Sequence, residues 1–246
     1  MMRPVTIVSL FLAGFVMAGP VVAPDAHAQS ADTWVHRWAV AQHEASVTIA
    51  RLQILERGTF STDGAFGPRE MEVVFDVTLQ PSSDAVTRSV REIRTEGRVV
   101  EEGQGRGRRR FRSPIRRDLL RAADALLFPA DLLRTLETRG SPEPDRVNGR
   151  ESFRLVTVSP DEESAIERVV WHFARPSGRL LQARAIIRGE DRGTLVVEVE
   201  YVRHEGLDIP VSRAISGSYG VRRRTRTYTV LLESLSLFEF ISVETL

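Results

Sequence analysis

The stretch Val169-Val-Trp-His-Phe-Ala-Arg-Pro-Ser-Gly-Arg-Leu-Leu-Gln-Ala-Arg-Ala-Ile-Ile187 decides the fold. Apolar side chains occupy alternate positions before a turn at 175–178, and they alternate again after it. Two alternating segments joined by a short glycine-containing turn are typical of a β-hairpin. Each strand then has one apolar face and one polar face. The stretch therefore predicts consecutive antiparallel strands with a single buried side.

The same alternation continues along the chain in both directions. Between residue 153 and the C-terminus, the pattern predicts strands at 153–158, 166–173, 181–187, 195–201, 211–219 and 222–240. Toward the N-terminus, it predicts strands at 47–55 and 70–79, a turn-rich break at 60–68, and a weaker strand or strand pair at 86–100. The whole pattern indicates one long antiparallel meander.

Three segments have helical spacing instead. We expect helices at 31–44, 118–127 and 130–138, the last two forming a helical insertion at about 116–138, followed by a loop at 140–144. A sheet with one apolar face needs a cover, and these helices are the only candidates. The predicted fold class is α+β: a strongly curved antiparallel β-sheet, or half-barrel, with helices covering its concave apolar face.

The N-terminus has the form of an export signal. A basic start at Met1-Met-Arg3 precedes an apolar run from Val5 to Ala18, and Ala26-His-Ala28 has the small-x-small form of a cleavage site. We expect 1–28 to be a signal peptide cleaved near Ala28 and 29–246 to form one soluble exported domain; the alternative is an uncleaved anchor. The chain has no cysteine, which excludes thiol catalysis and cysteine metal sites.

Basic charge is concentrated in one region. Residues 86–121 hold twelve arginines and five acidic residues, a local charge of +7 in a chain whose total charge is +1. The glycine- and arginine-rich segment 101–117 cannot contribute a core, so we expect a solvated loop or a docking surface for an anionic membrane or an envelope protein. Export argues against nucleic acid as the partner. The docking candidates are Arg106, Arg108, Arg109, Arg110 and Arg112.

No pattern of catalytic or metal-binding residues stands out. His36 and His43 are seven positions apart, two helical turns, which is too far for both to bind one metal ion. The serines of 216–220 lie in a run of predicted strands and not at a strand-to-helix elbow. We therefore predict no catalytic residue, no metal and no cofactor, and expect that the protein is not an enzyme.

Three stretches resemble the LolA-like periplasmic lipoprotein carriers. They are an Asn-Gly turn that runs into a strand at 147–156, an aromatic strand closed by a glycine turn at 170–180, and Gly206-Leu-Asp-Ile-Pro210 before the next strand. The resemblance covers most of the mature chain. It implies a half-barrel that binds an acyl chain, or the acyl groups of a lipidated protein, in the periplasm.

The inward row of the sheet is the candidate ligand surface. Burying one CH₂ group contributes about 0.8 kcal/mol, so an apolar pocket needs no precise polar groups. The same row could instead form a closed core, in which case the protein is an envelope interaction module that docks a partner or membrane through its Arg-rich loop. The row consists of Val73, Phe75, Val77, Leu79, Val169, Trp171, Phe173, Leu181, Ile187, Leu195, Val197, Val199 and Tyr201.

Overall fold

The computed structural model describes residues 31–64, 69–81, 83, 85–99, 115, 117–189, 193–223 and 226–245. Eleven strands of this part form one antiparallel sheet in the order β4-β3-β2-β1-β11-β10-β9-β8-β7-β6-β5. The strands are β1 Ile49–Gly64, β2 Arg69–Gln80, β3 Ala85–Thr95, β4 Arg98–Val99, β5 Glu137–Val147, β6 Arg150–Val158, β7 Ile166–Ala174, β8 Leu180–Arg188, β9 Thr194–His204, β10 Leu207–Arg223 and β11 Arg226–Thr245. The helices are α1 Ala31–Val47, α2 Arg117–Ala125 and α3 Pro129–Thr135.

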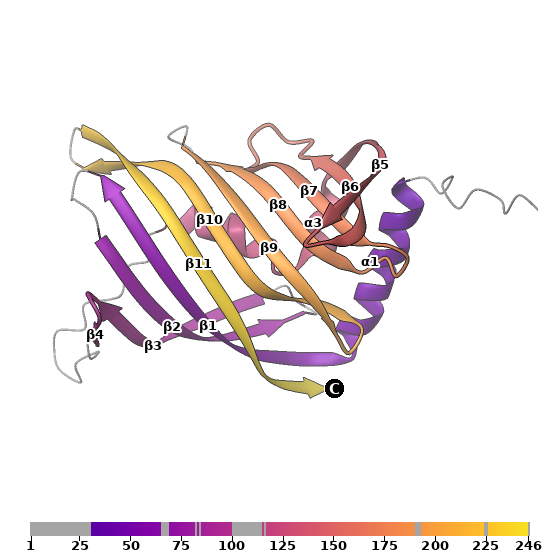
Figure 1. The fold of residues 1–246 in the computed structure, drawn as a ribbon, viewed down its shortest axis with the longest axis horizontal. Coiled ribbons are helices and arrows are strands. Elements are labelled where there is room, and N and C mark those ends of the chain that lie inside the picture. Colours follow the sequence, from indigo (N-terminus) through magenta and orange to yellow (C-terminus); the bar gives the residue numbers. More distant parts are fainter. Residues whose placement is uncertain are drawn as a thin grey trace, which may run out of the picture.

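The strand order explains where the helical insertion lies. β1 pairs with β11, so the strands nearest the two chain ends meet in the middle of the sheet. β4 and β5 then lie at opposite edges and do not pair with each other, and the sheet is not closed into a barrel. The chain between them must cross the sheet from edge to edge, and α2 and α3 belong to that crossing (Figure 1).

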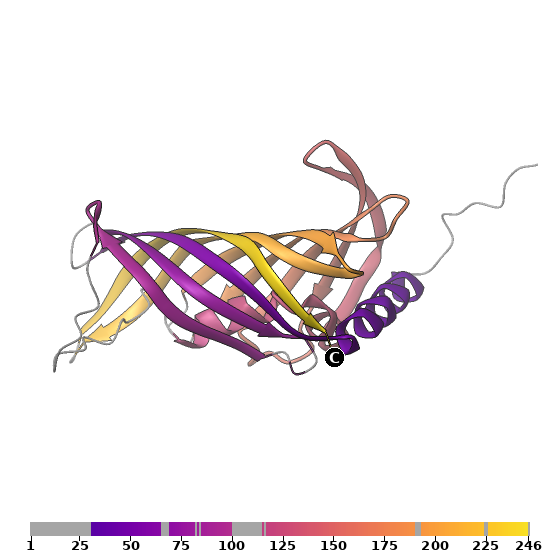
Figure 2. The same ribbon diagram turned by 90° about the horizontal axis from the view of Figure 1, so that it is seen from below.

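The sheet curves into an arch, with α2 and α3 on its hollow side and α1 at one end (Figure 2). Alternate residues of the strands are buried, as along Leu195, Val197 and Val199 of β9. Apolar side chains of both short helices, among them Leu119 and Leu133, belong to the same core cluster as these strand residues. Burying one such leucine contributes about 1.5–3 kcal/mol, so the insertion is held largely by apolar packing.

A buried hydrogen bond fixes the link between the two short helices. Tyr201 Oη donates to the Leu126 carbonyl oxygen at 2.5 Å, just after α2 ends. Burial, together with the nearby Asp208 carboxylate, raises the pKa of Tyr201 well above its ordinary value, so its hydroxyl keeps its proton. Pro129 then begins α3, a position where the missing N–H costs nothing.

Two segments predicted as turn or loop are strands. β1 continues through the predicted break to Gly64, because it pairs along its length with both β2 and β11. β5 includes 140–144 despite two prolines, since it is an edge strand and a register shift between Arg139 and Glu143 interrupts its pairing. The boundary predicted between the strands 211–219 and 222–240 lies later in the structure, because β10 runs to Arg223 and β11 begins at Arg226.

No helix in the described ranges is both long enough and apolar enough to span a membrane.

Candidate functional site

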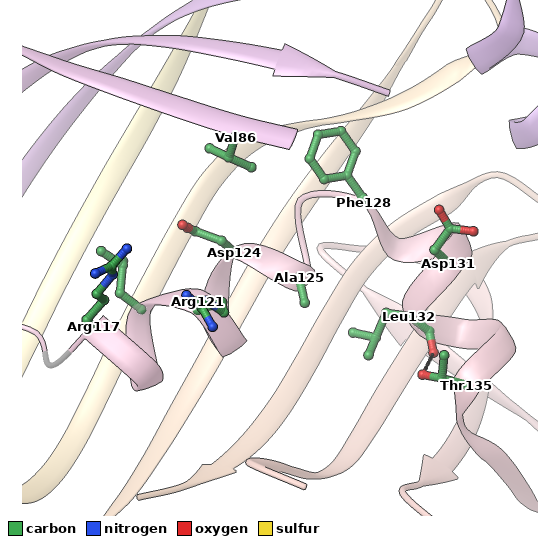
Figure 3. Close-up of a pocket in the computed structure, with 10 residues that line it drawn as sticks. Val86, Arg117, Arg121, Asp124, Ala125, Phe128, Asp131, Leu132 and Thr135 are labelled. Carbon is green, nitrogen blue, oxygen red and sulfur yellow. Dashed lines mark hydrogen bonds between the residues drawn. The ribbon is translucent and has the colours of Figure 1, made fainter. Parts of the chain in front are cut away.

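A groove of about 640 Å³ lies between β3 and the two short helices (Figure 3). Ligand pockets in proteins are typically about 300–1,000 Å³, so the groove is large enough for a small ligand. Most of its surface is apolar. The apolar lining residues are Val86, Leu120, Ala125, Phe128 and Leu132.

Polar side chains border the same groove. Arg117 and Arg121 contribute from α2, and Asp131 contributes from α3, where it forms an ion pair with Arg134. Thr135 also lines the groove, and its hydroxyl donates to the Leu132 carbonyl oxygen at 2.8 Å. The last polar residue of the lining, Asp124, points toward the sheet and belongs to a larger arrangement of charges.

Glu56, Arg88, Asp124 and Arg213 form a closed ring of ion pairs, here called the four-charge cluster. Arg213 donates to Glu56 Oε1 at 2.6 Å and to Asp124 Oδ1 at 2.7 Å. Arg88 donates to Glu56 Oε2 at 2.8 Å and to both carboxylate oxygens of Asp124 at 2.5 and 2.8 Å. Two cations alternate with two anions, so the cluster is neutral. It joins β1, β3 and β10 of the sheet to α2.

The cluster lies inside the protein. The Glu56 and Arg213 side chains are only 1% and 2% exposed. Burial raises the pKa of Glu56, but the Arg213 and Arg88 guanidinium groups outweigh burial and hold that pKa below the ordinary glutamate value. Burial likewise lowers the pKa of Arg88, and the Glu56 and Asp124 carboxylates more than reverse it. Glu56 and Arg88 are therefore charged near neutral pH. Removing one member of the cluster would leave an uncompensated buried charge.

The lowered pKa of Glu56 predicts acid sensitivity. An unfolded glutamate binds a proton near pH 4.3, where the folded protein still keeps Glu56 ionised. This contribution to stability is complete above that pH and is lost as the pH falls toward the folded pKa. We expect the urea-measured free energy of unfolding to fall below about pH 4.5, and to fall less steeply in Glu56→Gln. Equal slopes in the two proteins would contradict the lowered pKa.

A second buried carboxylate holds α1 against the sheet. Asp208 Oδ2 accepts from Trp38 Nε1 at 2.8 Å and from the Leu180 N–H at 2.9 Å, while Arg203 Nε donates to Oδ1 at 3.0 Å. Gln42, one helical turn after Trp38, accepts the Asp208 N–H at 2.8 Å. Two side chains of α1 are thereby fixed to the start of β10.

A smaller cavity of about 180 Å³ lies where α1, α3 and the start of β10 meet. Leu52, Leu79, Leu127 and Ile209 contribute apolar surface to it, and His43 lies at its α1 side. This volume is below the usual range for a ligand pocket. The larger groove is therefore the better candidate site.

The residues predicted to line a cavity are packed together in the core. Twelve of the thirteen belong to the main core cluster that also contains α2 and α3 residues. The exception is Leu181, which lies in a separate small cluster with Val147 and Ala174. A register shift pairs Phe173 with Leu180, so Leu180 takes the inward position expected for Leu181. The docking candidates Arg106, Arg108, Arg109, Arg110 and Arg112 lie outside the described residues.

Sequence patterns did not reveal the four-charge cluster or the role of Asp208. Glu56, Arg88 and Arg213 each lie in a predicted strand region or beside one, where a charged residue is read as part of the solvated face. Their position in the strand alternation was a possible signal. Arg213 is two residues from the buried Ile215, and residues two apart in a strand point to the same face of the sheet. Asp208 lies within Gly206–Pro210, and the sequence indicated only that this segment precedes a strand.

Comparison with known proteins gives structural likeness without sequence likeness. No protein-family model matches the chain, and no curated protein matches it. Among solved structures, a DUF1329 family protein from Desulfovibrio piger is 11% identical, with a TM-score of 0.38 over 84% of this chain and 92% of that one. A LolA superfamily protein from Nitrosomonas europaea is 8% identical, with a TM-score of 0.35 over 85% and 94% of the two chains. The lipoprotein LppX from Mycobacterium tuberculosis is 9% identical, with a TM-score of 0.28 over 83% and 94%.

LolA superfamily proteins are thus among the solved structures similar to this chain. The resemblance indicated by the sequence is found again in the structure comparison. At these identities and TM-scores the likeness is one of layout, and it carries no information about ligand or partner.

Proposed function

We propose that the protein is a non-enzymatic carrier or binding protein for acyl chains, either of a lipid or of a lipidated protein, in the periplasm. The observation that supports this most is the groove between β3 and the two short helices. Its lining is mostly apolar, and its volume is suited to a small ligand. The proposal takes residues 1–28 as a cleaved signal peptide and 29–246 as one domain.

In this proposal, α2 and α3 serve as the cover of the concave apolar face. Two features support a defined cover position. Apolar side chains of the helices pack into the sheet's core, and Asp124 of α2 is bonded to Arg88 of β3 and Arg213 of β10. A ligand chain would lie first in the groove, along Leu120 and Phe128. The predicted inward row, which packs against the helices, would line a larger cavity if the cover moved outward.

The physical basis is transfer of hydrocarbon out of water. Each CH₂ group placed against the apolar lining contributes about 0.8 kcal/mol, so binding strength should increase with chain length. No nucleophile or metal is needed for such binding, and release requires only another apolar surface. A carrier between two membranes fits this chemistry.

Filling the groove should reduce ligand uptake. Ala125→Trp places an indole ring among the lining residues, and Ala214→Trp, at an exposed position on β10, is the matched control. We expect native mass spectrometry to show co-purified acyl chains on the wild-type protein and on Ala214→Trp, and to show about tenfold less on Ala125→Trp. A wild-type protein that carries no acyl chain, and takes up no added fatty acid or apolar dye, would contradict the proposal.

A further inference from the structure

Two arginines at the α2 end of the groove have no ion-pair partner among the residues that the structure describes. Arg117 and Arg121 are four residues apart on α2, so their side chains are neighbours on one side of the helix. Both are exposed and both line the groove (Figure 3). Within the described part of the chain, neither guanidinium has a hydrogen bond or an ion pair. Like charges one turn apart repel each other, and a bound anion would relieve that repulsion.

The acidic residues of the groove do not supply this anion. Both oxygens of Asp124 are already bonded to Arg88 and Arg213, and Asp131 is paired with Arg134. Among the described residues, two arginines without an ion-pair partner therefore lie at one end of an apolar surface formed by Leu120, Ala125, Phe128 and Leu132. This distribution of charge and apolar surface matches a molecule with one anionic end and one hydrocarbon chain.

We propose that the groove selects single-chain amphiphiles with an anionic head. The head group, a carboxylate or a phosphate, lies between Arg117 and Arg121, whose planar guanidinium groups can each donate two parallel hydrogen bonds to it. The hydrocarbon chain runs along the helices toward Phe128. This inference rests on the proposed acyl-chain binding and adds the chemical class of the head group.

Three ligands with matched chains test the inference: oleate, lysophosphatidylglycerol with an oleoyl chain, and the uncharged monoolein. Binding is measured by displacement of a fluorescent fatty acid from the full mature chain. We expect Arg117→Gln/Arg121→Gln to weaken binding of the anionic ligands at least about tenfold, which corresponds to ~1.4 kcal/mol, and to leave monoolein within about twofold. Arg168→Gln/Arg184→Gln, which removes two exposed arginines from β7 and β8 on the other face of the sheet, should change none of the three affinities.

The outcomes separate the two proposals. If oleate or lysophosphatidylglycerol binds more tightly than monoolein, the tighter ligand identifies the preferred head group. Either result supports the inference when the Arg117→Gln/Arg121→Gln variant no longer shows this preference. Equal affinity for all three ligands, unchanged in that variant, would overturn the head-group inference and leave acyl-chain binding intact. Binding of none of the three would overturn both. Circular dichroism of each variant shows that the comparison is made between folded proteins.

Discussion

Glu56→Gln is expected to lower the free energy of unfolding by about 3–5 kcal/mol. Glutamine keeps the shape of the side chain but removes the negative charge that Arg213 and Arg88 contact at 2.6 and 2.8 Å. Arg213 would then remain buried with Asp124 as its only carboxylate partner. A buried charge that loses its partner keeps its full desolvation cost, so the loss should be much larger than for an exposed pair. Urea denaturation at neutral pH measures it.

An exposed ion pair provides the matched control. Glu151→Gln removes the same charge from the Arg146–Glu151 pair, whose atoms are 3.8 Å apart and whose side chains are both exposed. We expect a change within about 1 kcal/mol there. Similar small losses in both variants would mean that water reaches the four-charge cluster and that the cluster does not hold α2 to the sheet.

Asp208→Ala should release α1 from the sheet and cost about 3 kcal/mol of stability. The substitution removes the acceptor of the Trp38 and Leu180 N–H groups, and it leaves Arg203 without its carboxylate. Trp38 should become more exposed, which shifts tryptophan fluorescence to longer wavelength, and amide hydrogen exchange in α1 should accelerate. Urea denaturation gives the loss of stability.

Two further variants make this result specific. Asp208→Asn retains an oxygen that can accept from Trp38, so we expect a smaller loss of about 1–2 kcal/mol and an α1 that stays docked. Glu162→Ala, in an exposed turn, should change stability by no more than about 0.5 kcal/mol. If exchange in α1 is the same in Asp208→Ala as in the wild type, the helix is held by something other than Asp208.

The sheet could be predicted from the sequence because its signal is local. Alternation within each strand shows which side is buried, as it did for Val169, Trp171 and Phe173. The four-charge cluster could not be predicted in the same way. Arg213 and Glu56 are 157 residues apart, and their contact depends on the register that both β1 and β10 form with β11. In an isolated strand, a charged residue in an inward position looks the same as one in the solvated face.

The site was harder to predict than the fold for a related reason. The groove lies between β3 and the helical insertion, and it exists only because the chain crosses from one sheet edge to the other. The arginine excess of 86–121 was visible in the sequence. It led to docking candidates within 106–112 and not to Arg117 and Arg121 on α2. Leu181 shows that even alternation fails where a bulge shifts the register, since Leu180 is the residue that faces the core.

The most direct test of the account is to locate a bound acyl chain. Stearic acid carrying a doxyl spin label on its chain broadens the methyl NMR signals of nearby side chains. We predict broadening of Leu120 and Leu132 in the groove, with Leu231 and Leu237, exposed on the opposite face of β11, unaffected. Broadening of Leu231 and Leu237 alone, or of no methyl group, would contradict acyl-chain binding under α2 and α3.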